Sequence, residues 1–119
     1  MKKRKGLARI TQAFRYEYYN IASKVLKEKK QVIPCFAGWA SAQISPQGDV
    51  WPCCIRAVNY GNLREYEYYF KKVWYSKKAI EDRKKIKKGE CYCPLANAHY
   101  TNMLCNVKTM LKVLLNLLR

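Results

Sequence analysis

Cysteine is the side chain in this sequence that is best suited to chemistry. The chain of 119 residues has six of them, at Cys35, Cys53, Cys54, Cys91, Cys93 and Cys105. Thiolates that converge from separate pairs are a common way for proteins to hold zinc or an iron–sulfur cluster. Free cysteines are also often buried, so simple packing of reduced thiols is the competing interpretation. We expect metal binding at Cys35, Cys53, Cys91 and Cys93, and core packing for Cys54 and Cys105.

The N-terminal segment does not have the pattern of a signal peptide. It begins "MKKRKGLARITQAFRYEYYN", in which no uninterrupted apolar stretch follows the basic start. No run of residues approaches the ~18 apolar residues of a transmembrane helix. We therefore expect a cytoplasmic protein. In that compartment thiols stay reduced, and clustered cysteines bind metal more often than they form disulfides.

A β-hairpin is predicted between the first two cysteine positions. The segments "SAQIS" and "DVWPC" contain good strand formers, and "PQGD" between them has the proline and glycine of a tight turn. Because a short turn brings its two strands together, we expect Cys35 and Cys53 to approach each other. The close pair Cys91 and Cys93 then needs only a helix that returns to this end of the hairpin.

Helices are predicted on both sides of the hairpin. Apolar residues at spacings of three and four predict one helix over about 7–29 and another over about 68–87, with a break near Tyr75 and Ser76. The segment "IRAVNYGNLREYE" before the second helix is expected to be irregular. An amphipathic helix is predicted over about 106–119, and we expect it to pack on the N-terminal helix.

His99 is the only histidine of the chain. It would be a metal ligand if one of the four cysteines were not, although a packed or solvated histidine is the expectation. With a single histidine, the sequence does not support a triad of the serine or cysteine hydrolase type.

The order of residues in the cysteine-bearing region resembles the SPASM or "twitch" domain, the auxiliary-cluster module at the C-terminus of many radical SAM enzymes. The resemblance covers residues 34–94. It rests on an ordered combination rather than on one motif: Cys35, Gly38, Ile44, Gly48, Asp49, Val50, Pro52, Cys53, Gly61, Asn62, Leu63, Val73, Trp74, Arg83, Cys91 and Cys93.

The resemblance implies a 4Fe–4S cluster bound by thiolates beside a small hairpin. By position, Cys35 and Cys53 match the family's first two ligands, and Cys91 and Cys93 match its closing pair. In the family such a cluster positions a peptide or small-molecule substrate or relays electrons. The closing pair here is C-x-C, where the family more often has C-x2-C. Six cysteines are also too few for the second cluster of the full SPASM form.

Radical SAM chemistry in the family needs a C-x3-C-x2-C loop, and the cysteines of this chain do not have that spacing. The chain is also too short for the partial barrel that binds S-adenosyl-L-methionine. We therefore expect an accessory module that does not cleave S-adenosyl-L-methionine alone. Its partner would be a radical SAM core domain, either a missing upstream part or a separate chain.

The predicted fold class is α+β, with a small two-stranded antiparallel hairpin and flanking α-helices around a cysteine-bound metal cluster. We divide the chain into three parts. Residues 1–30 form an N-terminal amphipathic helix, residues 31–105 a SPASM/twitch-like cluster-binding domain, and residues 106–119 a C-terminal amphipathic helix.

The chain is strongly basic, with 24 Lys and Arg against 8 Asp and Glu and a formal net charge of +16. Such a balance favours nucleic acid, an anionic membrane surface or an acidic partner. Because the lysines are spread along the sequence, we expect only weak, nonspecific nucleic-acid binding, and we rank the membrane surface last. The tyrosine-rich segments "FRYEYY" and "YEYYF" are expected to pack the core rather than stack on bases. A basic structural-zinc protein that binds nucleic acid is the alternative function.

Overall fold

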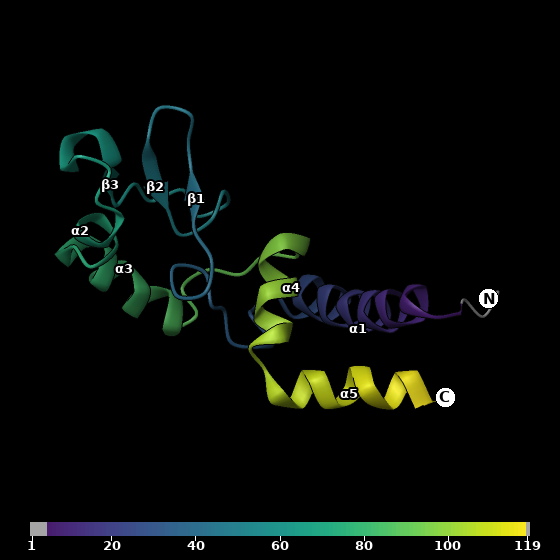
Figure 1. The fold of residues 1–119 in the computed structure, drawn as a ribbon. Helices are drawn as coiled ribbons and strands as arrows, with labels where there is room; N and C mark the ends of the chain where they lie inside the picture. Colours follow the sequence, from purple (N-terminus) through teal and green to yellow (C-terminus); the bar gives the residue numbers. More distant parts are fainter. Residues whose placement is uncertain (1–4, 119) are drawn as a thin grey trace.

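The computed structural model describes residues 5–118, which form two lobes (Figure 1). The sheet lobe contains three short strands, a 3-10 turn and two helices: β1 (Gln43–Ile44), β2 (Asp49–Trp51), β3 (Gly61–Asn62), η1 (Leu63–Tyr66), α2 (Phe70–Trp74) and α3 (Lys77–Lys87). The helical lobe contains α1 (Leu7–Glu28), α4 (Ala96–Leu104) and α5 (Val107–Leu118). The chain passes between the lobes twice, after α1 and after α3. The predicted mixed fold is confirmed.

The sheet has three antiparallel strands in the order β1-β2-β3, one more than the predicted hairpin. Ile44 pairs with Val50 in the hairpin, and Val50 pairs with Gly61 on its other side. β3 has only two residues, neither of them a strand former, so the sequence showed no strand there. Its pairing is supported by the Asn62 side chain, whose Nδ2 donates to Asp49 Oδ1 at 2.9 Å.

The sheet lobe has its own apolar core, built from Val50, Tyr60, Val73 and Ala79. Two glycines allow the backbone to approach it closely. A Cβ at Gly38, whose φ is 77°, would lie 2.9 Å from the Tyr60 hydroxyl, and one at Gly61 would lie 3.3 Å from Val73 Cγ1. The predicted break after Trp74 is also present, because Ser76 caps α3 by accepting the N–H of Ala79 at 3.3 Å.

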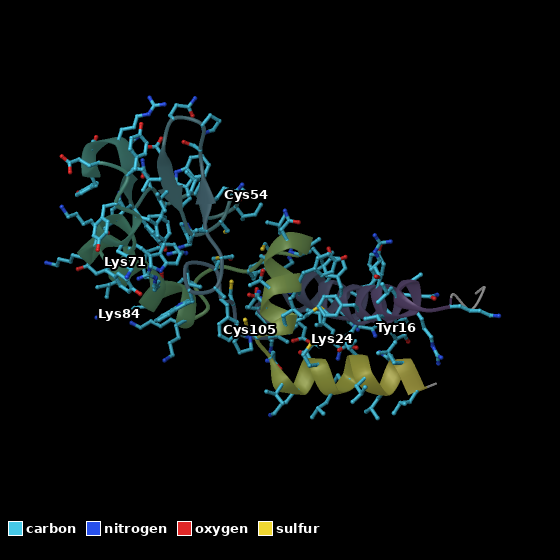
Figure 2. The ribbon with its side chains drawn as sticks, in the orientation of Figure 1. Tyr16, Lys24, Cys54, Lys71, Lys84 and Cys105 are labelled. Atoms are coloured by element: carbon cyan, nitrogen blue, oxygen red, sulfur yellow. The ribbon has the colours of Figure 1, made fainter. Side chains whose placement is uncertain are left out.

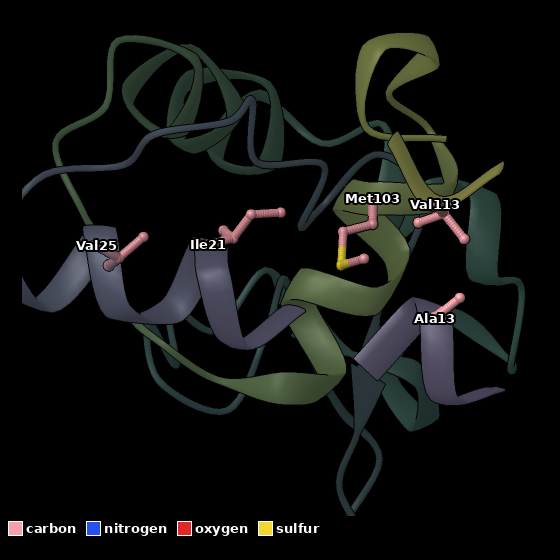
Figure 3. Packing of buried hydrophobic residues seen from close by; sticks show 5 residues of the cluster. All are labelled: Ala13, Ile21, Val25, Met103 and Val113. Carbon is pink, nitrogen blue, oxygen red and sulfur yellow. The ribbon is translucent and has the colours of Figure 1, made fainter. Parts of the chain in front are cut away.

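The helical lobe has a second core, made by Ala13, Ile21 and Val25 of α1, Met103 of α4 and Val113 of α5 (Figure 3). The spacing of the α1 residues places them on one side of that helix. α1 and α5 run antiparallel, since Arg9 near the start of α1 donates to the carbonyl of Leu117 near the end of α5. The predicted packing of the C-terminal helix on the N-terminal helix is therefore present in the structure.

α5 buries only one of its apolar sides. Thr109 and Val113 face the core, whereas another set of aliphatic residues is exposed: Val107, Leu111, Leu114, Leu115 and Leu118. Leu7 and Ile10, at the start of the predicted apolar stripe of α1, are exposed as well. No helix within residues 5–118 is long and apolar enough to cross a membrane.

One element was not predicted, and one prediction was wrong. The segment after Pro94 forms helix α4, which no prediction from the sequence covered. Most tyrosines of "FRYEYY" and "YEYYF" do not pack the core, because Tyr16, Tyr19, Tyr68 and Tyr69 are all exposed.

Candidate metal centre

Cys53 lies two positions after the end of β2, at the start of a tight turn. The backbone N–H of Arg56 donates to Cys53 Sγ at 3.3 Å, and the N–H of Ala57 donates to the Cys53 carbonyl at 2.9 Å. The turn therefore holds the Cys53 sulfur in place.

Cys35 lies in the segment that connects α1 to β1, and its side chain is half-buried. The next residue, Phe36, is fixed from the helical lobe, because its N–H donates to Oδ1 of Asn102 on α4 at 2.7 Å. The carbonyl of Phe36 accepts the N–H groups of Trp39 and Ala40, which tightens the turn that follows. Cys35 is thus held at a defined position although it lies outside any helix or strand.

Cys91 and Cys93 follow α3, and Gly89, two residues after the end of this helix, has a φ of 75° that suits the termination of a helix. His99 Nε2 lies 2.6 Å from the Cys93 carbonyl, and a carbonyl only accepts, so Nε2 carries the proton. The hydroxyl of Tyr18 on α1 donates to the carbonyl of Pro94 at 2.7 Å. Both contacts come from the helical lobe.

The four predicted ligand thiols lie close enough to influence one another. Burial raises the pKa of Cys91, and the nearby thiols of Cys35 and Cys53 raise it further. Burial also raises the pKa of Cys93, with the Leu95 N–H acting in the opposite sense and the other three thiols adding to the rise. Such mutual effects require proximity. The fold therefore brings together four half-buried thiols from segments far apart in the sequence.

These thiols do not form the tight group that a single ion needs. Among residues 5–118, no three His, Cys, Asp or Glu side chains are placed to hold one metal ion. In a tetrahedral zinc site with Zn–S bonds of about 2.3 Å, the sulfurs are roughly 4 Å apart. The thiols are therefore neighbours, but their sulfurs are not grouped closely enough to bind one ion together; these are the thiols of Cys35, Cys53, Cys91 and Cys93.

Two polar side chains of α4, His99 and Asn102, are fully buried beside the thiol-bearing segments. Burial lowers the pKa of His99, so its ring is neutral, and the Cys93 carbonyl partly opposes this effect. Each side chain uses one atom to hold a cysteine-bearing segment, and the other atom, His99 Nδ1 or Asn102 Nδ2, has no partner. The sequence indicated no role for Asn102, whereas the expectation of a packed or solvated His99 agrees with its burial here.

On the sheet side, a buried charge pair lies next to the thiols. Arg56 Nε donates to Asp82 Oδ1 at 2.7 Å, and Arg56 Nη2 lies 2.6 Å from the same oxygen. The hydroxyl of Tyr60 donates to Asp82 Oδ2 at 3.0 Å. Arg56 also lowers the pKa of Cys91 through its charge and a hydrogen bond, against the larger effect of burial. Sequence analysis did not identify this network.

Arg83 closes the same region, and it was recognised in the sequence only as part of the family pattern. Its side chain donates to the carbonyls of Gly38 and Trp74. Its guanidinium carbon also lies 4.4 Å from the centre of the Trp74 ring. Arg83 therefore ties the turn after Cys35 to the helices of the sheet lobe.

The remaining two cysteines lie apart from this arrangement. Cys54 and Cys105 are both exposed, and Figure 2 labels both. The prediction that they pack in the core was therefore wrong. That they do not bind metal stays a prediction.

The sequence was compared with models of protein families. The model named SPASM, described as an iron–sulfur cluster-binding domain, matches residues 35–94, half of the chain. The chain belongs to the SPASM family. The resemblance inferred from the residues is thus confirmed. Comparisons with curated proteins and with solved structures gave no significant match.

The SPASM match begins at Cys35 and ends directly after Cys93. It therefore contains the four neighbouring thiols and leaves out α1, α4 and α5. The donors present fit an iron–sulfur cluster: four half-buried thiols, N–H groups aimed at the sulfurs of Cys53 and Cys93, and the cation of Arg56.

Proposed function

We propose that the chain holds one 4Fe–4S cluster on Cys35, Cys53, Cys91 and Cys93. The observation that carries this proposal is that the SPASM match contains four half-buried thiols, of which Cys91 and Cys93 lie close enough to the others for their pKa values to be raised by them. In a four-iron cluster each thiolate binds a different iron, so the sulfurs lie farther apart than around a single ion. Within residues 5–118 no three His, Cys, Asp or Glu side chains are placed to hold one ion, which supports a cluster over a zinc site.

We further propose that this module serves a radical SAM core domain, supplied by a separate chain or by another part of a longer protein. The cluster would supply one-electron chemistry or a binding point for a peptide or small-molecule substrate. The support is membership of the SPASM family, since SPASM modules accompany radical SAM cores. We place the protein in the cytoplasm, in keeping with six free thiols and no disulfide.

Anaerobic reconstitution with iron and sulfide tests the cluster. We expect a brown protein with a broad visible absorbance and about four irons per chain. Serine substitution of Cys35, Cys53, Cys91 or Cys93 should reduce the bound iron. Cys54→Ser and Cys105→Ser are matched controls that should retain it. One tightly held zinc with no iron would favour the zinc alternative, and loss in Cys54→Ser with full retention in Cys53→Ser would refute our ligand choice.

A further inference from the structure

Arg56 occupies an unusual position in the thiol site. Its backbone N–H bonds the Cys53 sulfur, while its side chain lies mostly buried, with 13% of its surface exposed. A buried guanidinium needs a compensating charge, and Asp82, itself 6% exposed, supplies it. Two Arg56 nitrogens bond a single oxygen of that carboxylate, and the other oxygen accepts the Tyr60 hydroxyl.

This arrangement fixes where the positive charge lies. Arginine has five N–H donors in a rigid plane, and Asp82 engages only one edge of it. The charge of Arg56 and a side-chain hydrogen bond from it lower the pKa of Cys91, in keeping with a guanidinium beside that thiol, and the backbone N–H of the same residue bonds the Cys53 sulfur at 3.3 Å. The Arg56–Asp82 pair is thus a fixed dipole with its positive end at the cysteines.

We propose that Arg56, oriented by Asp82, is a positioning residue that stabilises the reduced form of the cluster held by the four thiolates. The inference rests on the proposed function. One electron from a low-potential donor makes the thiolate-bound cluster more negative by one charge and moves no proton. A cation fixed beside the thiolates stabilises that added charge, and in a partly buried site water screens the attraction only weakly.

Two variants should shift the reduction potential in opposite directions. Arg56→Gln removes the cation, so its potential should become more negative than that of the unaltered chain. Asp82→Asn keeps a carbonyl oxygen for Arg56 but removes the opposing negative charge, so its potential should become more positive. Arg64→Gln is the matched control, because it removes an exposed arginine charge of the same sheet lobe and should leave the potential unchanged.

The measurement is an anaerobic titration of each reconstituted chain with dithionite, followed by absorbance and electron paramagnetic resonance. Iron and sulfide content is determined on the same samples. Opposite shifts in Arg56→Gln and Asp82→Asn support the inference. A fully loaded Arg56→Gln with an unchanged potential would overturn it and leave the cluster proposal intact, whereas an unaltered chain that binds no iron would overturn both.

If Arg56→Gln loses its fold, Asp82→Asn and Arg56→Lys together decide the question. A role that is only structural would change the stability of Asp82→Asn without moving its potential upward. Arg56→Lys adds a further check, because an ammonium group restores the charge and should return the potential toward that of the unaltered chain. No return in a folded, loaded Arg56→Lys protein would count against a charge effect.

Discussion

The buried Asp82 carboxylate joins the sheet-lobe core to the thiol site. It accepts from Arg56 on one oxygen and from Tyr60 on the other, so neither oxygen lacks a partner. Removing one member of a buried charged network usually costs more than the net value of the contact, because the remaining groups stay buried without partners. The loss of stability on each substitution therefore depends on which buried polar groups it leaves without a partner.

Tyr60→Phe should lower the free energy of unfolding by about 1–3 kcal/mol at neutral pH, because Asp82 Oδ2 loses its donor. Tyr19→Phe, at an exposed tyrosine, should change it little. Denaturant unfolding of both variants beside the unaltered chain measures this difference. Equal stability of all three would show that the buried hydroxyl is unimportant.

The alkaline pH dependence of stability should also change in Tyr60→Phe. Burial, the bond to Asp82 and its charge raise the pKa of Tyr60 far above 10. In the unfolded chain this tyrosine ionises near pH 10, while the folded chain keeps its proton. The stabilisation that the protonated Tyr60 hydroxyl gives to the folded chain is therefore complete below pH 10 and is lost as the pH rises above that value. The unaltered chain should lose stability between about pH 10 and 11 more steeply than Tyr60→Phe.

At the scale of elements, the sequence predicted those with a strong local pattern. The long helix α1, the hairpin turn and the break before α3 follow from apolar spacing, from "PQGD" and from the cap at Ser76. The helix α4 does not, because "ANAHYTNML" has a weak apolar pattern and no side-chain cap. Its stability comes from Met103 in the core and from bonds to segments near Cys35 and Cys93.

The residues of the candidate site also divide into those that a sequence pattern indicates and those that it does not. The four thiols were predicted from spacing and the family resemblance, which are properties of the sequence itself. The supporting roles of Asn102 and Arg56 were not predicted, since each of these residues acts across a long separation. Asn102 bonds Phe36 over 66 positions, and Arg56 bonds Asp82 over 26. No local pattern marks a polar residue whose partner is set only by the fold.

α5 allows its two apolar sides to be compared directly. Val113 is buried against α1 and α4, and its neighbour Leu114 is exposed. Val113→Ala should lower the free energy of unfolding by about 1–3 kcal/mol, because it leaves a cavity in the helical-lobe core. Leu114→Ala should change it by less than about 0.5 kcal/mol. Urea unfolding of both variants tests this, and a larger loss for Leu114→Ala would contradict the observed orientation of the helix.

At the scale of the whole molecule, the charge of +16 is distributed rather than concentrated. Figure 2 labels Lys24 on α1 in the helical lobe, and Lys71 and Lys84 on α2 and α3 in the sheet lobe. Base-specific recognition needs side chains set into a groove, whereas scattered lysines contact phosphates without regard to sequence.

We therefore predict weak nucleic-acid binding that does not distinguish between unrelated duplexes. If six or more phosphates are contacted, affinity should fall by roughly a thousandfold or more between about 50 and 200 mM salt. Fluorescence anisotropy with two duplexes of different sequence measures both properties. A nanomolar complex with one duplex only, at physiological salt, would instead favour the zinc alternative.

The two lobes have separate apolar cores; Cys35 and the pair Cys91 and Cys93 lie where the chain crosses between the lobes, and Cys53 lies within the sheet lobe. Metal bound to these cysteines would be a covalent crosslink, closing the loops from Cys35 to Cys53 and from Cys53 to Cys91. Closing these loops removes conformational entropy from the unfolded chain. The free energy of metal binding then also becomes free energy that docks one lobe on the other. Loading of the cofactor and the mutual orientation of the two lobes would therefore be thermodynamically coupled in this protein.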